Sequence, residues 1–322
     1  MKRLAAAIAA SVLVLGIAAC GGDDNGSGDS ASDDEVTLGM ANFTLAAPYF
    51  IGMDEAVKKA ANEQGNVEVI STDANGDAAK LTSDVEDLVA QGVDGLIISA
   101  GPLESAPTAL NSAEEAEIPV VLVDRKLADG NYTSWIGPDN EAIGLQDGEF
   151  LAEELGGQGT IAIISGGPAD NTIGSARTSG MLAGIEGTDI ETIKAPEFGE
   201  WSTDGGQQVM EDVLASNQDI DAVFCENDSM CLGAQKAIRD AGRQDQIILA
   251  GVDGQKEALK AILDGTNYVV TGLNDSEQIG TQGFERMMAI LDGEDVEQDT
   301  VLPSPRITTE NAKEHYDPNS IF

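Results

Sequence analysis

Short apolar runs alternate with longer segments of helical periodicity along most of the chain. A strand is predicted at Val36–Met40, and the helix predicted at Tyr49–Gln64 ends before Gly65. Gly95–Ile98 is almost wholly apolar, as is expected for a parallel strand that is buried on both faces. Repeated strand–helix units of this length predict an α/β fold of doubly wound parallel sheets, each covered by helices on both faces.

The alternation starts again after a turn at Gly137–Pro138, so the chain is predicted to form two similar lobes. The other predicted strands are Val67–Ile70, Ile118–Val123, Tyr132–Ile136, Thr160–Ile164, Glu191–Lys194, Ala222–Phe224, Ile247–Ala250 and Tyr268–Val270. The other predicted helices are Asp77–Gln91, Ser105–Ala116, Glu141–Leu155, Ile173–Ile185, Gly205–Ala215, Met230–Ala241, Lys256–Leu263 and Glu277–Leu291, and an irregular tail is expected after them.

The N-terminal segment follows a different pattern. Lys2 and Arg3 precede an apolar run, Leu4–Ile17, which is too short for a stable transmembrane helix and is typical of a signal peptide. Small residues then lead to Cys20, which predicts a signal peptide over residues 1–19 and lipidation of Cys20. An ordinary cleavage site beside an incidental cysteine is the alternative. Residues 20–35 have no large apolar side chain, so a flexible acidic linker is expected.

This segment predicts an exported protein that is held by lipid at the outer face of the cytoplasmic membrane or in the periplasm. The chain of 322 residues has 17 basic and 57 acidic side chains and a net charge of −40. Such a surface repels phosphate backbones, so no nucleic-acid partner is expected. The acidic bias fits either an ordinary exported protein or a protein adapted to a saline habitat.

Ligands of open parallel sheets bind beyond the carboxyl ends of the strands. The candidate ligand contacts are therefore the polar and aromatic residues that follow the predicted strands: Asp124, Asp253, Arg125, Arg177, Asn227, Asn274, Tyr49, Phe50 and Trp201. Carboxylates accept hydrogen bonds from hydroxyl groups, guanidinium groups donate them, and amides do both. Aromatic rings can cover an apolar C–H face. This set predicts a neutral polyhydroxylated ligand, because the carboxylates would repel a phosphate.

Each of these residues also has a purely structural interpretation. Asp124 and Arg125 could form a surface salt bridge, and Asp228 could cap the helix that follows it. The two asparagines could satisfy turns, and the three aromatic residues could belong to the cores of the lobes. Their common place at strand ends favours a ligand site. Glu226, which precedes Asn227, is predicted to point away from the ligand.

The sequence argues against an enzyme. The single histidine, His315, lies in a polar tail, and no glycine-rich phosphate loop with a following lysine is present. The chain has too few cysteines for a thiolate zinc site. No catalytic residue, metal or cofactor is therefore predicted. A ligand-responsive transcription regulator would need a basic DNA-binding headpiece, whereas this chain begins with a predicted signal peptide.

Seven motifs, in their order and spacing, resemble the periplasmic ribose-binding protein family between Val36 and about Ile307. They are Pro48-Tyr49-Phe50, Val123-Asp124-Arg125, Asp139-Asn140, Ala176-Arg177, Phe224–Met230, Gly251–Gly254 and Gln278–Gly280. By this resemblance the nine candidate residues match the family's hydrogen-bonding and stacking positions. The chain differs from ribose binders at Ala47, where they have an amide, at Asn274, where they have glutamine, and at Trp201, where they have phenylalanine. These differences change the expected shape of the pocket.

The resemblance implies the substrate-binding component of a carbohydrate ABC importer. Its two lobes would comprise residues 36–138 with 275–303 and residues 139–274 with 304–322, joined by three crossings near Asp139, Asn274 and Pro303. A monomer would capture a pentose, hexose or inositol in the cleft and deliver it to the ABC permease subunits. A receptor of the same fold that feeds a signalling partner is the alternative.

Two cysteines remain in the body of the chain. Cys225 ends a predicted strand, and Cys231 lies in the first turns of the next helix. A disulfide that stiffens the segment around Asn227 fits an exported protein, and two buried free thiols fit equally well.

Overall fold

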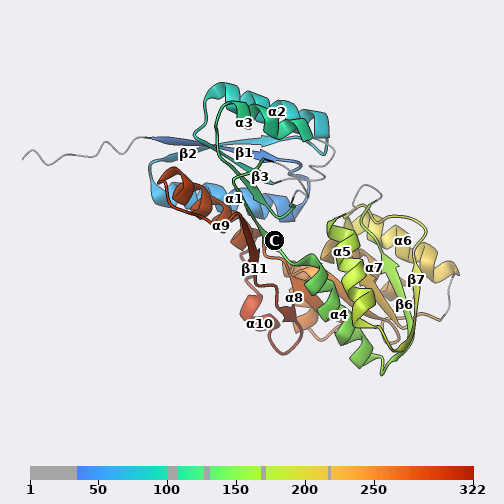
Figure 1. Cartoon of the computed structure of the whole chain (residues 1–322). Coiled ribbons are helices and arrows are strands. Elements are labelled where there is room, and N and C mark those ends of the chain that lie inside the picture. Colours follow the sequence, from blue (N-terminus) through green and yellow to red (C-terminus); the bar gives the residue numbers. More distant parts are fainter. Residues whose placement is uncertain (1–34, 100–106, 127–130, 168–171, 217–218) are drawn as a thin grey trace, which may run out of the picture. The chain divides into compact units, whose positions relative to one another are not determined.

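The computed structural model describes residues 35–99, 107–126, 131–167, 172–216 and 219–322. The predicted signal peptide, the predicted lipidation site at Cys20 and the predicted linker up to residue 34 lie outside the described residues. The described residues form two six-stranded sheets, each with helices on both faces (Figure 1). We call each sheet with its covering helices a lobe. None of the helices in these ranges is long and apolar enough to cross a membrane.

The first lobe has an entirely parallel sheet in the order β11-β5-β4-β3-β1-β2. Its strands are β1 (Val36–Asn42), β2 (Val67–Asp73), β3 (Gly95–Ser99), β4 (Val120–Val123), β5 (Ser134–Pro138) and β11 (Asp299–Leu302). One face is covered by α2 (Ala78–Gln91), the 3₁₀-helix η2 (Pro107–Leu110) and α3 (Asn111–Glu115), and the other by α1 (Pro48–Gln64) and α9 (Ser276–Leu291). Leu96 and Ile98 pack with α2 while Ile97 packs with α1 and α9, so β3 is buried on both faces as predicted.

The second lobe repeats this arrangement in the order β12-β10-β9-β8-β6-β7. Its strands are β6 (Gln158–Ile164), β7 (Asp189–Lys194), β8 (Ala222–Cys225), β9 (Ile248–Asp253), β10 (Tyr268–Leu273) and β12 (Arg306–Ile307), of which only β12 is antiparallel to its neighbour. One face is covered by α4 (Asn140–Glu154) and α5 (Ile173–Gly184), and the other by α6 (Thr203–Ser216), α7 (Asp228–Asp240) and α8 (Lys256–Leu263).

The structure confirms the two predicted runs of strands and helices, with two local corrections. In place of a continuous helix at Ser105–Ala116, the described part of that segment contains η2 followed by the short helix α3. The tail after α9 is not irregular: it contributes β11, β12 and α10 (Ala312–His315). These edge strands have four and two residues, which is too short for a hydrophobic period to be recognised, and their pairing with β5 and β10 defines them.

The chain passes from one sheet to the other at three short connections. They join β5 to α4, β10 to α9, and β11 to β12. The second connection contains Asn274, which therefore lies at the carboxyl end of β10 and next to the start of a helix of the first lobe.

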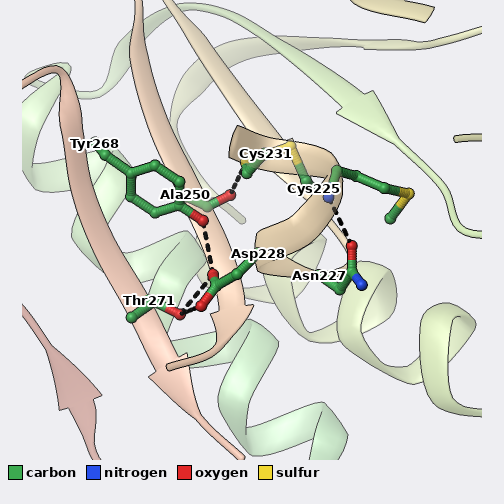
Figure 2. Close-up of a disulfide and its surroundings, with 8 residues drawn as sticks. Cys225, Asn227, Asp228, Cys231, Ala250, Tyr268 and Thr271 are labelled. Carbon is green, nitrogen blue, oxygen red and sulfur yellow. Dashed lines mark hydrogen bonds between the residues drawn. A yellow bond between two sulfur atoms is a disulfide. The ribbon is translucent and has the colours of Figure 1, made fainter. Parts of the chain in front are cut away.

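The structure joins Cys225 and Cys231 by a disulfide, with their Cα atoms 5.4 Å apart (Figure 2). Cys225 ends β8 and Cys231 lies in the first turn of α7, and both side chains are fully buried. The six-residue separation means that the bridge closes a small loop, and this loop contains Asn227 and Asp228.

We expect the mature chain to show no titratable thiol from this pair in denaturant without reductant. Replacing both residues, as Cys225→Ala with Cys231→Ala, should lower the free energy of unfolding by about 2 kcal/mol, because the short loop loses its constraint in the unfolded state. Thiol titration before and after reduction, with the double variant as the control, measures this. Two thiols that titrate without reductant would contradict the disulfide.

Candidate ligand-binding site

A cavity of about 330 Å³ is lined by residues from the carboxyl ends of strands in both lobes. All nine residues predicted from the sequence line it: Tyr49, Phe50, Asp124, Arg125, Arg177, Trp201, Asn227, Asp253 and Asn274. The cavity is also lined by Phe43, Thr44, Ala46, Ala47, Ile173, Glu200, Ser202, Ser229 and Phe322. Its volume is near the lower end of the range of about 300–1,000 Å³ that is typical of small-molecule sites.

Asn274 connects the polar groups of the two lobes. Its Nδ2 donates to the hydroxyl of Tyr49 at 2.9 Å and lies 3.4 Å from Asp124 Oδ1 and 3.3 Å from Asp253 Oδ1. The hydroxyl of Tyr49 in turn donates to Asp124 Oδ1 at 2.8 Å. One amide thus lies between two carboxylates that belong to different sheets.

Arg177 is held in place from three sides. Its Nη2 pairs with Asp253 Oδ1 at 3.0 Å, its Nε donates to Asn140 Oδ1 at 2.8 Å, and its Nη1 donates to the backbone carbonyl of Glu226 at 2.6 Å. The side chain is only 3% exposed. The planar guanidinium group is therefore fixed in orientation before a ligand binds.

Arg125 reaches the second lobe, where its Nη1 donates to Thr172 Oγ1 at 2.5 Å. Asp124 and Arg125 are both buried, so the alternative interpretation of a surface salt bridge is wrong.

Burial dominates the protonation of the two carboxylates in the cavity. Desolvation raises the pKa of Asp124, although the Arg177 charge and the Tyr49 hydroxyl lower it. Desolvation also raises the pKa of Asp253 to about 6, against the opposing effects of Arg177 and Asn274. The neighbouring donors favour the ionised form of both carboxylates, but burial outweighs them. Ligand hydroxyls that donate to these oxygens would favour the ionised form further.

Three of the site residues have a left-handed backbone. The φ angles are 66° for Asp124, 56° for Trp201 and 122° for Asp253, which cost roughly 1–3 kcal/mol each for a residue with a Cβ atom. The surroundings hold these conformations. Trp135 Nε1 donates to the carbonyl oxygen of Asp124 at 3.1 Å, and Asp228 binds the backbone directly after Asp253.

Asn227 both lines the cavity and caps α7. Its Oδ1 accepts from the backbone N–H of Met230 at 2.9 Å (Figure 2), and its Nδ2 lies 3.4 Å from the carbonyl oxygen of Trp201. The alternative interpretation that Asp228 caps this helix is therefore wrong. The cap occupies the amide oxygen of Asn227, so its Nδ2 group, which has a second hydrogen besides the one directed at Trp201, is the donor available to a ligand.

Asp228 stands behind the cavity with a fully buried carboxylate. Its Oδ1 accepts from Tyr268 Oη at 2.6 Å and Thr271 Oγ1 at 2.8 Å (Figure 2), and its Oδ2 accepts from the backbone N–H groups of Gly254 at 2.8 Å and Gln255 at 2.7 Å. These contacts fix the turn that follows Asp253.

The indole ring of Trp201 lies directly against the backbone of Gly166. A Cβ atom at position 166 would come within 2.0 Å of the ring, so only glycine permits this approach. The carboxylate of Glu226 points away from the cavity, as predicted, and accepts from Gly166 N at 2.6 Å and Thr178 Oγ1 at 2.6 Å. Glu226 therefore supports this loop, so Glu226→Ala is expected to disturb the position of Trp201.

Sequence reasoning missed several lining residues. Phe43 directly follows β1 and Ser229 lies shortly after β8, so the rule that selected the other strand-end residues could have selected both. Phe322 lies far along the chain from every predicted strand end, and nothing in the local sequence marks it. Among the described residues, no group of three or more His, Cys, Asp or Glu side chains could hold a metal ion.

The model of the periplasmic binding protein domain family matches residues 38–295, most of the described chain. The chain belongs to the periplasmic binding protein family. It is 33% identical over 277 residues to the ribose import binding protein of Bacillus subtilis, covering 85% of this chain and 88% of that protein. It is 30% identical over 321 residues to a xylitol-binding protein of Mycolicibacterium smegmatis, and this match covers 96% of this chain and 86% of that protein.

A solved structure supports the fold independently. An ABC transporter solute-binding protein from Mycobacterium smegmatis, crystallised with bound glycerol, superposes with a TM-score of 0.83 at 30% identity and covers 88% of this chain and 98% of its own. These matches confirm the predicted resemblance to the ribose-binding protein family and the type I periplasmic binding protein fold. This periplasmic binding protein is thus a binding protein of the extracytoplasmic compartment rather than an enzyme.

The buried Asp228 makes a specific pH dependence of stability testable. Desolvation and the nearby Asp253 raise the pKa of Asp228 from an ordinary 3.8 to about 7, despite its hydrogen bonds from Tyr268 and Thr271. The folded state therefore holds this proton more tightly than the unfolded chain. The contribution of Asp228 to the free energy of unfolding is full below about pH 4 and is lost as pH rises through about 7.

Asp228→Asn should consequently show a weaker decline in the free energy of unfolding between pH 4 and pH 8 than the parent protein. Denaturant titrations across this range measure the slope. Asp240→Asn, at an exposed position of the same helix, is the matched control and should keep the parent's slope. An Asp228→Asn variant with the parent's slope would show that the folded-state pKa is not raised.

Proposed function

We propose that this protein is the lipid-anchored sugar-binding component of an ABC importer, and that it captures a monosaccharide-sized polyol in the cavity described above. The observation that carries the proposal is the buried polar array of Asp124, Arg177, Asp253 and Asn274, with aromatic rings beside it. This array offers fixed donors and acceptors at short spacing in a small cavity. Each hydroxyl of a polyol can both donate and accept, so the array matches that chemistry.

The charges in the cavity favour a neutral ligand. Two buried carboxylates, Asp124 and Asp253, accompany two buried guanidinium groups, Arg125 and Arg177, so the formal charges of the buried groups cancel, and Glu200 adds an exposed carboxylate at the edge of the cavity. An anionic ligand would leave an excess of negative charge in a buried site, which is costly. Trp201 and the pair Tyr49 and Phe50 are proposed to cover the two apolar faces of a sugar ring.

The relatives support the same ligand class. Their names state ribose and xylitol as ligands, and the similar solved structure contains glycerol. All three are neutral polyols. We therefore infer a pentose, hexose or inositol as the ligand here.

The connections between the sheets suggest how the ligand is captured. We propose a hinge at the three crossings, between a lobe of residues 36–138 with 275–303 and a lobe of residues 139–274 with 304–322. A ligand that contacts both lobes binds a closed arrangement better than an open one and so shifts the population toward closure. The monomer would then deliver its sugar to the permease subunits in the membrane.

Replacing either carboxylate should weaken sugar binding. Hydrogen bonds to charged groups contribute ~1.5–3 kcal/mol each, so Asp124→Ala should lower the affinity for the parent's best sugar by roughly ten- to a hundred-fold. Asp253→Ala should cost more, because Arg177 loses its ion-pair partner while it stays buried.

Calorimetric titration of folded variants with a panel of pentoses, hexoses and inositols measures these losses. Asp240→Ala removes an exposed carboxylate, 57% exposed, and should bind as the parent does. Parent-like binding by both Asp124→Ala and Asp253→Ala would place the ligand elsewhere.

The proposed anchor is tested separately at Cys20. Labelling of cells with a radioactive fatty acid should mark the parent protein, whereas Cys20→Ala should carry no label and be either released or left unprocessed. Ser27→Ala, in the same predicted linker, should label normally. A single acyl chain binds membranes only marginally, so stable retention should involve at least two chains. A parent protein without label would contradict lipidation.

A further inference from the structure

Phe322 reaches the ligand cavity from the part of the chain that follows both sheets. Its side chain is 9% exposed and lines the cavity together with Tyr49 and Phe50. The Phe322 ring packs edge-on against Tyr49, with centroids 5.2 Å apart and an interplanar angle of 83°. Tyr49 packs in the same manner against Phe50, with centroids 5.4 Å apart. The three rings form a continuous aromatic wall.

The start of α1 is shaped to receive this ring. Gly52 lies one turn after Tyr49, and a Cβ atom there would come within 3.3 Å of Phe322 Cβ and 2.8 Å of Ser276 Oγ. The absence of a side chain at position 52 therefore lets residues 276 and 322 approach the helix closely. A larger residue at position 52 would clash with Ser276 Oγ and crowd Phe322 Cβ.

The segment before Phe322 is hydrogen-bonded to both lobes through Ser320. Lys256 Nζ, on α8 of the second lobe, donates to the carbonyl oxygen of Ser320 at 2.5 Å. Ser320 Oγ donates to Glu277 Oε1, on α9 of the first lobe, at 2.6 Å. The backbone N–H of Phe322 donates to Ser320 Oγ at 3.1 Å. These contacts hold the ring in the cavity wall, while the preceding side chain, Ile321, is 45% exposed.

We propose that Phe322 is a specificity-determining residue that limits the size of the sugar accepted by this site, an inference that rests on the proposed function. The ring forms part of the wall of a cavity of only about 330 Å³, so its removal enlarges the space for ligand substituents. It also braces Tyr49, whose hydroxyl is hydrogen-bonded to Asp124 and Asn274. The size limit and the orientation of Tyr49 therefore depend on the same side chain.

The test compares the affinities of D-ribose, xylitol, D-fructose, D-allose and myo-inositol for the parent protein and its variants by calorimetry. Phe322→Ala should weaken the parent's best ligand by roughly three- to ten-fold, as expected for the loss of an aromatic pair. It should also shift the ratio of affinities toward the six-carbon ligands. Phe322→Trp fills more of the cavity and should shift that ratio toward the five-carbon ligands.

Ile321→Ala is the matched control and should keep the affinities and ratios of the parent within about two-fold. Folding of each variant is checked by its thermal unfolding. Unchanged ratios in both Phe322 variants, with or without a uniform loss of affinity, would overturn the size-limiting role while leaving the proposed function intact. A parent protein that binds neither these five ligands nor any other member of the panel of pentoses, hexoses and inositols would overturn both.

Discussion

Burial of charged groups at the meeting of the two lobes is the constraint on which the site depends. Arg125, Arg177, Asp124 and Asp253 are all nearly inaccessible to solvent. A buried charge without a partner costs several kcal/mol, so these groups need fixed partners in the folded protein. Arg177 obtains them from Asp253, from Asn140 at the start of α4 and from the carbonyl oxygen of Glu226. Pairing of charge thus brings several separate elements of the second lobe together.

Residues behind the cavity hold the backbone of the lining residues Asp124 and Asp253 in place. Asp228 has no direct part in the cavity lining, yet it binds two backbone N–H groups after Asp253 and two hydroxyl groups of β10. Trp135 has the corresponding role behind Asp124. Such supports let Asp124 and Asp253 keep left-handed backbones that would otherwise relax. The donors and acceptors are therefore oriented before a ligand arrives, which reduces the entropy lost on binding.

The balance of charge inside the cavity differs sharply from that of the whole chain. The protein has a net charge of −40, but the buried part of the cavity pairs two carboxylates with two guanidinium groups beside aromatic rings. Buried charged groups suit the hydroxyl groups at the edges of a sugar, and aromatic rings suit the C–H groups on its faces.

The sequence alone was sufficient to predict the strand–helix alternation, the two sheets of mainly parallel strands and all nine lining residues named as candidates. It could do so because β3 and its neighbours carry unbroken apolar runs, and because parallel strands place the residues that follow them at one edge. The partners that these residues take depend on how the chain packs. Arg177 pairs with Asp253, Asn227 rather than Asp228 caps α7, and Glu226 supports the Trp201 loop. The edge strands β11 and β12 and the aromatic contact of Phe322 also have no local signal, because they depend on pairing and packing between residues far apart in the chain.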